Sequence, residues 1–292
     1  MFTRSKTIPA WALLSLASNG LLILTVVQLL LREHKLPDHA AVSASANATS
    51  LEEKTLRQGL TTAANQDLPL WGPRHKWTYE QWVAQLGREA EAAATNQPQR
   101  LTILAGDSLS LWFPPQLLPR ERSWLNQGIS GETSAGLRKR LSLFDRVQAE
   151  TIFVMIGIND LIRGVEEDTI LENQRQIIRD LRSFHPNAQI VVQSILPHSG
   201  EKATWEGRDR LKAIPNERIR ELNHQLKAIA SEEGVLFLDL HPLFADANGN
   251  LRLELSTDGL HLNDRGYWVW RSALKLYSQL ELDPKPQSEQ IR

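Results

Sequence analysis

The segment Leu101-Thr102-Ile103-Leu104-Ala105-Gly106-Asp107-Ser108 is the strongest indication of the fold class, because a short apolar run ends there in a glycine turn. A run of this length without strict polar alternation is typical of a strand buried on both faces. Such strands belong to parallel sheets that helices cover on both sides. The segment therefore predicts an α/β domain in which Gly106-Asp107-Ser108 follows the carboxyl end of a strand.

The chain downstream repeats this alternation of short apolar runs and longer amphipathic ones. Besides Leu101–Ala105, the candidate strands are residues 123–126, 151–156, 189–195 and 235–239. Helical patterns lie at about residues 132–147, 167–184, 215–233 and 264–280. We therefore expect a three-layer α/β/α domain with a mostly parallel sheet of about five strands, and the sequence shows no internal repeat.

The folded domain is expected to begin near Trp71 and to cover residues 71–285, followed by a short tail at 286–292. Near its start, Thr78-Tyr79-Glu80-Gln81 has the form of a capping box. Trp77 and Trp82 flank this box at the spacing of a hydrophobic staple. This pattern predicts a helix that begins directly after Thr78.

The N-terminal part of the chain is predicted to be a membrane anchor and a tether. Ile8–Leu31 is an uncharged, mostly apolar stretch of 24 residues with basic flanks. A helix rising about 1.5 Å per residue needs roughly 20 residues to cross a ~30 Å hydrocarbon core, so this stretch is long enough to form a transmembrane helix. We assign residues 1–35 to the anchor, and 36–70, rich in Ala, Ser and Thr, to a flexible tether.

The expected location is a membrane, with a single pass and the domain outside the cytoplasm. The positive-inside rule favours neither orientation strongly, because basic residues flank both ends of the apolar stretch. The alternative is a cleaved signal peptide and secretion, since Ala44-Ser45-Ala46 has the form of a cleavage site. That triplet lies beyond the charged segment Arg32-Glu33-His34-Lys35, which favours the uncleaved anchor.

Composition excludes several classes of function. The formal net charge is -1, so no overall basic field attracts nucleic acid. The chain has no cysteine, which excludes disulfides, thiolate metal sites and a cysteine nucleophile. The histidines of the tether and of the helical patterns lack metal-ligand spacing, and we expect neither a metal nor a cofactor.

Reactive residues follow the ends of the predicted strands, which is where open α/β sheets bind ligands. In chain order they are Ser108, the glycine-rich stretch Gly128–Thr133, Asn159, and, after a loop beyond the last strand, Asp258 and His261. Because the carboxyl ends of parallel strands share one edge of the sheet, these residues should converge on one rim.

This set of residues has the composition that acyl transfer needs. A serine hydroxyl is a weak nucleophile until a base removes its proton, which an imidazole such as that of His261 can do near neutral pH. Asp258, at the third position before His261, can fix the imidazole tautomer and stabilise the imidazolium. The candidate donors to the oxyanion are the amides of Ser108 and Gly131 and the side chain of Asn159.

On these residues the sequence resembles the GDSL/SGNH hydrolases, whose four blocks contribute Ser, Gly, Asn and His. The matching residues here are Ser108, Gly131, Asn159 and His261, and Asp258 matches the family's acidic residue. The resemblance covers roughly residues 101–280. It implies a flavodoxin-like SGNH fold and the hydrolysis of acyl esters, thioesters or acetylated sugars.

Two features distinguish this sequence from many members of the family and from the α/β-hydrolases. The third block reads Gly157-Ile158-Asn159-Asp160 where many members have a second glycine, but the asparagine is kept. The G-x-S-x-G elbow of the α/β-hydrolases is absent around Ser108, which argues against that class. Each block alone could be a helix cap or a turn, whereas all of them in order at strand ends favour an active site.

We therefore predict a membrane-anchored serine esterase that uses Ser108, Asp258 and His261 through a covalent acyl-serine intermediate. The expected substrate is a short-chain ester, a lysophospholipid or an O-acetylated carbohydrate. The alternatives are a non-catalytic binding domain for an acylated glycan or lipid, and an acyltransferase using the same residues. A long loop at residues 200–214 can act as a lid or a substrate wall, and the sequence assigns no role to His198 or Trp205.

Overall fold

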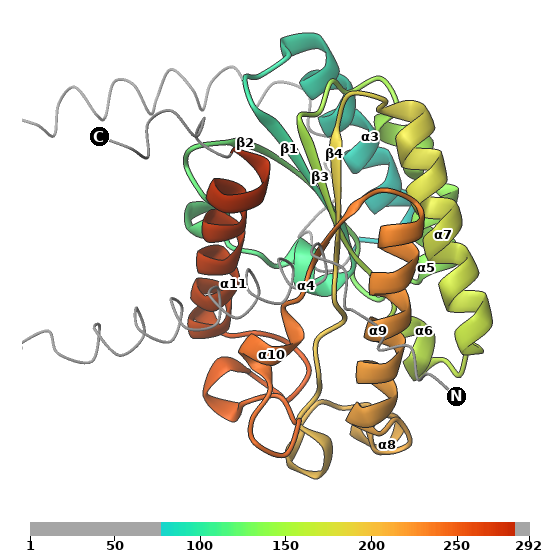
Figure 1. The fold of residues 1–292 in the computed structure, drawn as a ribbon, viewed down its shortest axis with the longest axis vertical. Coiled ribbons are helices and arrows are strands. Elements are labelled where there is room, and N and C mark those ends of the chain that lie inside the picture. The colour runs from blue at the N-terminus through green and yellow to red at the C-terminus, as the bar shows by residue number, and fades with distance from the viewer. Residues whose placement is uncertain (1–76, 284–292) are drawn as a thin grey trace, which may run out of the picture.

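Five parallel strands form the centre of the computed structural model, which describes residues 77–283 (Figure 1). The strands are β1 (Leu101–Gly106), β2 (Ser123–Gly128), β3 (Thr151–Met155), β4 (Gln189–Gln193) and β5 (Leu236–Leu238). Their order across the sheet is β2-β1-β3-β4-β5, the order of flavodoxin-like sheets. The α/β class and the five predicted strands are confirmed. The register places Gly106 opposite both Gly128 and Met155, which aligns the carboxyl ends of three strands.

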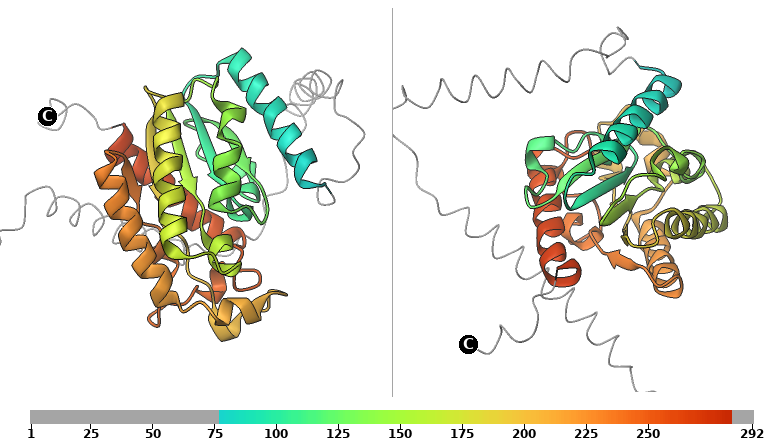
Figure 2. Two further views of the ribbon diagram at one scale, coloured as in Figure 1. Left: turned by 90° about the vertical axis from the view of Figure 1, so that its right-hand side faces the viewer. Right: turned by 90° about the horizontal axis from the view of Figure 1, so that it is seen from above.

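Helices cover both faces of the sheet, giving three layers (Figures 1 and 2). One face packs against α4 (Ser108–Leu111), α10 (His241–Phe244) and α11 (Asp264–Tyr277). The other packs against α3 (Tyr79–Asn96), α5 (Ser134–Lys139), α6 (Ile158–Ile162), α7 (Glu167–Phe184) and α9 (Asn216–Glu232). On β1, Leu104 belongs to the first core and Ile103 to the second. Burial on both sides explains why the strands read as unbroken apolar runs.

The predicted capping box at the start of α3 is confirmed. Thr78 Oγ1 accepts a hydrogen bond from the Gln81 amide at 3.3 Å, and Gln81 Oε1 accepts one from the Thr78 amide at 2.8 Å. The rings of Trp77 and Trp82 lie 4.9 Å apart between centroids, as the staple predicted. These contacts fix where the helix begins.

The predicted helix at residues 132–147 is wrong as a single element. The chain forms α5, which ends at Lys139, and then a separate 3-10 turn, Leu141–Phe144. Arg140 separates the two because its side chain turns inward, where its Nε donates to Glu132 Oε2 at 2.8 Å. The patterns at 167–184 and 215–233 became α7 and α9 with ends within one residue, while 264–280 became α11 and a π-helical turn, Ser278–Leu282.

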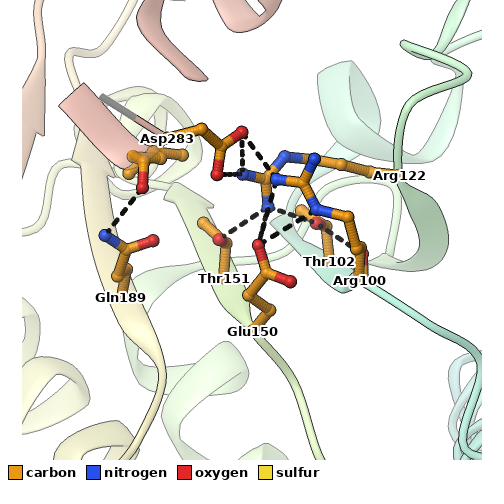
Figure 3. A network of polar contacts seen from close by, with 8 residues as sticks. Arg100, Thr102, Arg122, Glu150, Thr151, Gln189 and Asp283 are labelled. Atoms are coloured by element: carbon orange, nitrogen blue, oxygen red, sulfur yellow. Dashed lines mark hydrogen bonds and ion pairs between the residues drawn. The ribbon is translucent and has the colours of Figure 1, made fainter. Parts of the chain in front are cut away.

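A network of hydrogen bonds and ion pairs covers the amino ends of β1 and β3 (Figure 3). The Arg122 side chain is 2% exposed, and its guanidinium donates to Thr102 Oγ1 on β1 and to Thr151 Oγ1 on β3, at 3.3 and 2.9 Å. It also pairs with Glu150 at 3.2 Å and with Asp283 at 3.0 Å. The end of the described chain is thereby tied to the edge of the sheet opposite to the strand ends that carry the reactive residues.

The predicted anchor (1–35), tether (36–70) and C-terminal tail (286–292) lie outside the described residues. Within 77–283, no helix combines the length and the apolar character that crossing a membrane requires. In the same part of the chain, α8 (Arg208–Lys212) and a short 3-10 turn, Gly200–Lys202, occupy the long loop between β4 and α9.

Candidate active site

Ser108 is the first residue of α4, and a single residue, Asp107, separates it from the end of β1. Asp107 caps this short helix, since its Oδ1 accepts a hydrogen bond from the Leu109 amide at 3.0 Å. Gly106 allows the turn to pass close to β3, because a Cβ there would lie 2.3 Å from the Met155 carbonyl oxygen. The serine hydroxyl is thus fixed at the carboxyl end of the central strands.

A chain of two side-chain hydrogen bonds joins Asp258, His261 and Ser108. His261 Nδ1 lies 2.7 Å from Asp258 Oδ2, and His261 Nε2 lies 3.2 Å from Ser108 Oγ. Because the carboxylate only accepts, Nδ1 carries the ring proton and leaves Nε2 free to accept the serine proton. The fold brings together residues that are 153 positions apart in the sequence.

The Asp258 carboxylate is held by its own loop. Its Oδ1 accepts hydrogen bonds from the amides of Leu260 and His261 at 3.0 and 2.8 Å. Burial pushes the pKa of Asp258 upward, but the hydrogen bonds from the His261 side chain and from the two amides outweigh it, and the pKa is lowered overall. The group therefore stays ionised at neutral pH, as a partner for an imidazolium must.

The two remaining candidate residues lie on the loop after β2 and on the short helix after β3. Gly131 has a φ of +74°, a conformation that glycine adopts without strain, and its carbonyl accepts from Arg163 Nη2 at 2.7 Å. Asn159 belongs to α6, and within the described chain its buried Nδ2 has no hydrogen-bond partner. A buried donor without an acceptor costs about 1–3 kcal/mol, so the position of Asn159 is unfavourable for stability by itself.

Asp160 joins this loop and this helix to each other. Its carboxylate accepts from the Ser134 amide at 2.8 Å and from the Ser134 hydroxyl at 2.6 Å. Burial raises the pKa of Asp160, although the hydrogen bonds from Ser134 oppose the shift. The loop after β2 and the helix after β3 are thus fixed relative to one another.

A family model described as the GDSL-like Lipase/Acylhydrolase family matches residues 71–269. The chain belongs to this family. The resemblance seen in the sequence is thereby confirmed, and the protein is an ester-bond hydrolase.

Two relatives of this GDSL-family chain carry esterase names. An isoamyl acetate-hydrolyzing esterase of Saccharomyces cerevisiae is 25% identical over 167 residues, which cover 53% of this chain and 68% of the relative. An arylesterase of Vibrio mimicus is 26% identical over 129 residues, covering 38% and 62%. A solved structure from Streptococcus pneumonia, provisionally described as a platelet activating factor, matches with a TM-score of 0.63 at 24% identity. It covers 80% of this chain and 100% of its own, and at that identity the likeness shows the fold alone.

Two features of this GDSL-family site were not anticipated from the sequence. Glu132 and Arg140 form a buried ion pair, and Arg140 Nη2 also donates to the Gly106 carbonyl at 3.2 Å. Burial lowers the pKa of Arg140, against the opposing effect of Glu132. In the sequence, Glu132 and Arg140 look like ordinary surface charges in a helical pattern. No local pattern therefore indicates that they are buried.

The second feature is Trp112, which lies over the imidazole with its ring centroid 4.5 Å from that of His261. Its side chain is 48% exposed and borders an open hollow of about 770 Å³ that Thr257, Asn263 and Arg265 also line. The i+4 spacing from Ser108 on a helix could have indicated this neighbour. Another hollow, beside Arg182 and Gly234, lies at the amino end of β4 and away from Ser108.

The structure also places the histidines that the sequence left unassigned. His198 is 2% exposed, and both of its ring nitrogens are engaged inside its own loop, by Gly200 and Ile214. It is therefore not a pocket wall. His241 is buried in α10.

Proposed function

We propose that the protein is a serine esterase that works through a covalent acyl intermediate on Ser108. The observation that carries the proposal is the hydrogen-bonded chain from Asp258 through His261 to Ser108. A non-catalytic binding domain has no need of an oriented base beside a serine hydroxyl. Family membership supports ester hydrolysis, while the individual roles of these residues are our inference.

In the proposed mechanism, Ser108 Oγ attacks the ester carbonyl carbon as its proton moves to His261 Nε2. Asp258 stabilises the imidazolium that forms. Collapse of the tetrahedral intermediate expels the alcohol, which takes the proton back from His261 Nε2. A water molecule then attacks the acyl-serine by the same route, releasing the carboxylic acid and free Ser108.

The negative charge on the tetrahedral oxygen needs donors that are already in place. We assign this role to the amides of Ser108 and Gly131 and to Asn159 Nδ2. In support, Asn159 Nδ2 is a buried donor with no acceptor among residues 77–283. The bonds from Arg163 to the Gly131 carbonyl and from Ser134 to Asp160 hold the loop of Gly131 and the helix of Asn159 in place. Such preorganised donors are each worth about 10²–10³ in rate.

We further propose that the substrate is an acyl ester, either of a small alcohol or of an acylated glycan or lipid. The open hollow beside Trp112 supports this, because Trp112, whose ring contacts that of His261, also borders space for an alcohol portion. The yeast relative is named for the hydrolysis of a small acetate ester.

A fluorophosphonate probe on the full-length protein in detergent tests the proposal. We expect a single adduct on Ser108, and hydrolysis of p-nitrophenyl esters that Ser108→Ala abolishes. Ser110→Ala is the matched control, since Ser110 is a buried serine on the same short helix and should leave labelling intact. Labelling of Ser110 or Ser130 instead would contradict the assignment. Transfer of the acyl group to an added alcohol in preference to water would make the protein an acyltransferase.

We also propose that the catalytic domain lies outside the cytoplasm, held by the apolar stretch Ile8–Leu31. Support comes from the length and lack of charge of that stretch. Alkaline phosphatase fused after Arg292 should be active in a bacterial host, because that enzyme folds only outside the cytoplasm. An inactive phosphatase fusion together with a fluorescent GFP fusion at the same site would reverse the orientation.

A further inference from the structure

The loop that follows β4 holds the backbone of the candidate catalytic acid. The Thr204 and Trp205 amides both donate to the Asp258 carbonyl, at 2.8 and 2.9 Å. The Ser199 amide donates to the next carbonyl, that of Gly259, at 2.8 Å. We call residues 198–205 the clamp segment, because these three bonds fix the Asp258–Gly259 turn from outside its own loop.

Close packing holds the clamp segment against the Asp258–Gly259 turn. Gly259 has a φ of +89°, and a Cβ there would lie 2.6 Å from Ala203 Cα. Ala203 and Leu260 belong to the same buried core, together with Leu211 from the far end of the loop. The clamp segment therefore cannot move away without opening that core.

His198 pins the clamp segment through its ring. Its Nδ1 accepts a hydrogen bond from the Gly200 amide at 3.0 Å, and its Nε2 lies 2.7 Å from the Ile214 carbonyl oxygen. Since an amide only donates and a carbonyl only accepts, both bonds form with one species alone, the neutral ring with its proton on Nε2. Burial lowers the pKa of His198, although the bond to Ile214 opposes the shift, which favours that neutral form.

The backbone of His198 is fixed as well. Its amide donates to Asn216 Oδ1 at 3.0 Å, and its carbonyl accepts from Asn216 Nδ2 at 2.8 Å. The Leu251 amide donates to the same carbonyl at 3.1 Å. His198 thus joins the start of α9 and the loop after α10 to the clamp segment.

We infer that His198 is a positioning residue for the reaction, acting through the clamp segment on Asp258. The inference rests on the proposed function, because it assigns to Asp258 the orientation of the catalytic base. Substrate does not reach His198, whose ring is enclosed in its own loop. Its role is to keep Asp258 Oδ2 at 2.7 Å from His261 Nδ1.

The decisive variant is His198→Ala, which leaves the Gly200 amide and the Ile214 carbonyl without the ring. We expect kcat for p-nitrophenyl acetate to fall roughly 10- to 100-fold, the cost of a misplaced catalytic group, with KM nearly unchanged. The acidic limb of kcat/KM should move to lower pH, because a displaced Asp258 stabilises the imidazolium less. The same shift should appear when proton NMR follows the His261 ring during an acid titration.

His185→Ala is the matched control. His185 is also a buried histidine, its Nδ1 contacts the Val147 carbonyl at 3.1 Å, and it stacks on Phe144, away from the Asp258 turn. This variant should unfold at a lower urea concentration than the wild type. The pH dependence of its kcat/KM should match that of the wild type. His198→Gln restores a donor toward the Ile214 carbonyl and should recover part of kcat.

Asn216→Ala tests the inference in a second way, because it removes two hydrogen bonds to the His198 backbone and leaves the His198 ring in place. It should shift kcat and the acidic limb in the same direction as His198→Ala but by less. Wild-type kcat and an unmoved acidic limb in folded His198→Ala, or in Asn216→Ala where His198→Ala does not fold, would overturn the inference. A wild type that neither hydrolyses esters nor reacts with the fluorophosphonate would refute the proposed function instead, while the NMR titration would still test the positioning of His261.

Discussion

Asp107 is a buried carboxyl directly before the candidate nucleophile, and its ionisation is governed by burial. Its side chain is 1% exposed, and within the described chain its Oδ2 has no hydrogen-bond partner. Burial raises the pKa of Asp107 to about 7, against the lowering effect of the Leu109 amide, and the neighbouring Asp160 raises it further. The sequence shows only a good helix cap here, because a cap motif carries no information on solvent access.

The stability of the protein should reflect this carboxyl, and Asp107→Asn tests it. The folded state holds the proton between the unfolded pKa of about 3.9 and the folded pKa of about 7. The contribution of Asp107 to the free energy of unfolding is therefore complete below the first value and is lost as pH rises through the second. Asparagine still accepts from Leu109 but does not ionise. Urea denaturation at roughly pH 5 and pH 8 should show the variant gaining stability relative to wild type as pH rises.

A stability difference that does not change with pH would contradict this reading of Asp107. Asp209→Asn controls for the loss of one negative charge, because the Asp209 side chain is 89% exposed in α8.

At the scale of elements, the site is made of short helices placed directly after strands. α4 and α6 begin within three residues of the ends of β1 and β3, and each carries a candidate residue in its first turn. The apolar runs and glycine turns of the sequence predicted this placement, because strand ends and turns are local features. The break between α5 and the following turn was not predictable, since it depends on Arg140 meeting Glu132 and the Gly106 carbonyl in the interior.

At the scale of the whole molecule, Arg122 and Asp283 join positions 161 residues apart (Figure 3). The carboxylate of Asp283 pairs with the buried guanidinium through both oxygens, at 3.0 Å each. Burial raises the pKa of Asp283, but the hydrogen bond from Arg100 and the charge of Arg122 outweigh it, and the pKa is lowered overall. This ion pair therefore holds the end of the described chain against the amino ends of the strands, away from Ser108.

Asp283→Ala should lower the free energy of unfolding by about 1–3 kcal/mol, because it leaves a buried charged donor without part of its acceptors. Fluorophosphonate labelling of Ser108 in the folded variant should match the wild type. Glu91→Ala is the matched control, since the Arg146–Glu91 pair is 75% and 56% exposed and an exposed pair contributes less than about 1 kcal/mol. Equal urea midpoints for both variants would show that the network does not hold the chain end.

The layered parallel sheet, the residues after the strand ends and the spacing of Asp258 and His261 could all be predicted from the sequence. These features follow from the periodicity of burial and from turns, which act over a few residues. The roles of Ser108, Asp258, His261, Gly131 and Asn159 stay predictions. Two contacts could not be predicted: His261 Nε2 lies 3.2 Å from Ser108 Oγ, and the His198 ring holds the loop that packs behind Asp258. These contacts join segments far apart in the chain, and no local pattern encodes which buried groups will meet once the chain has folded.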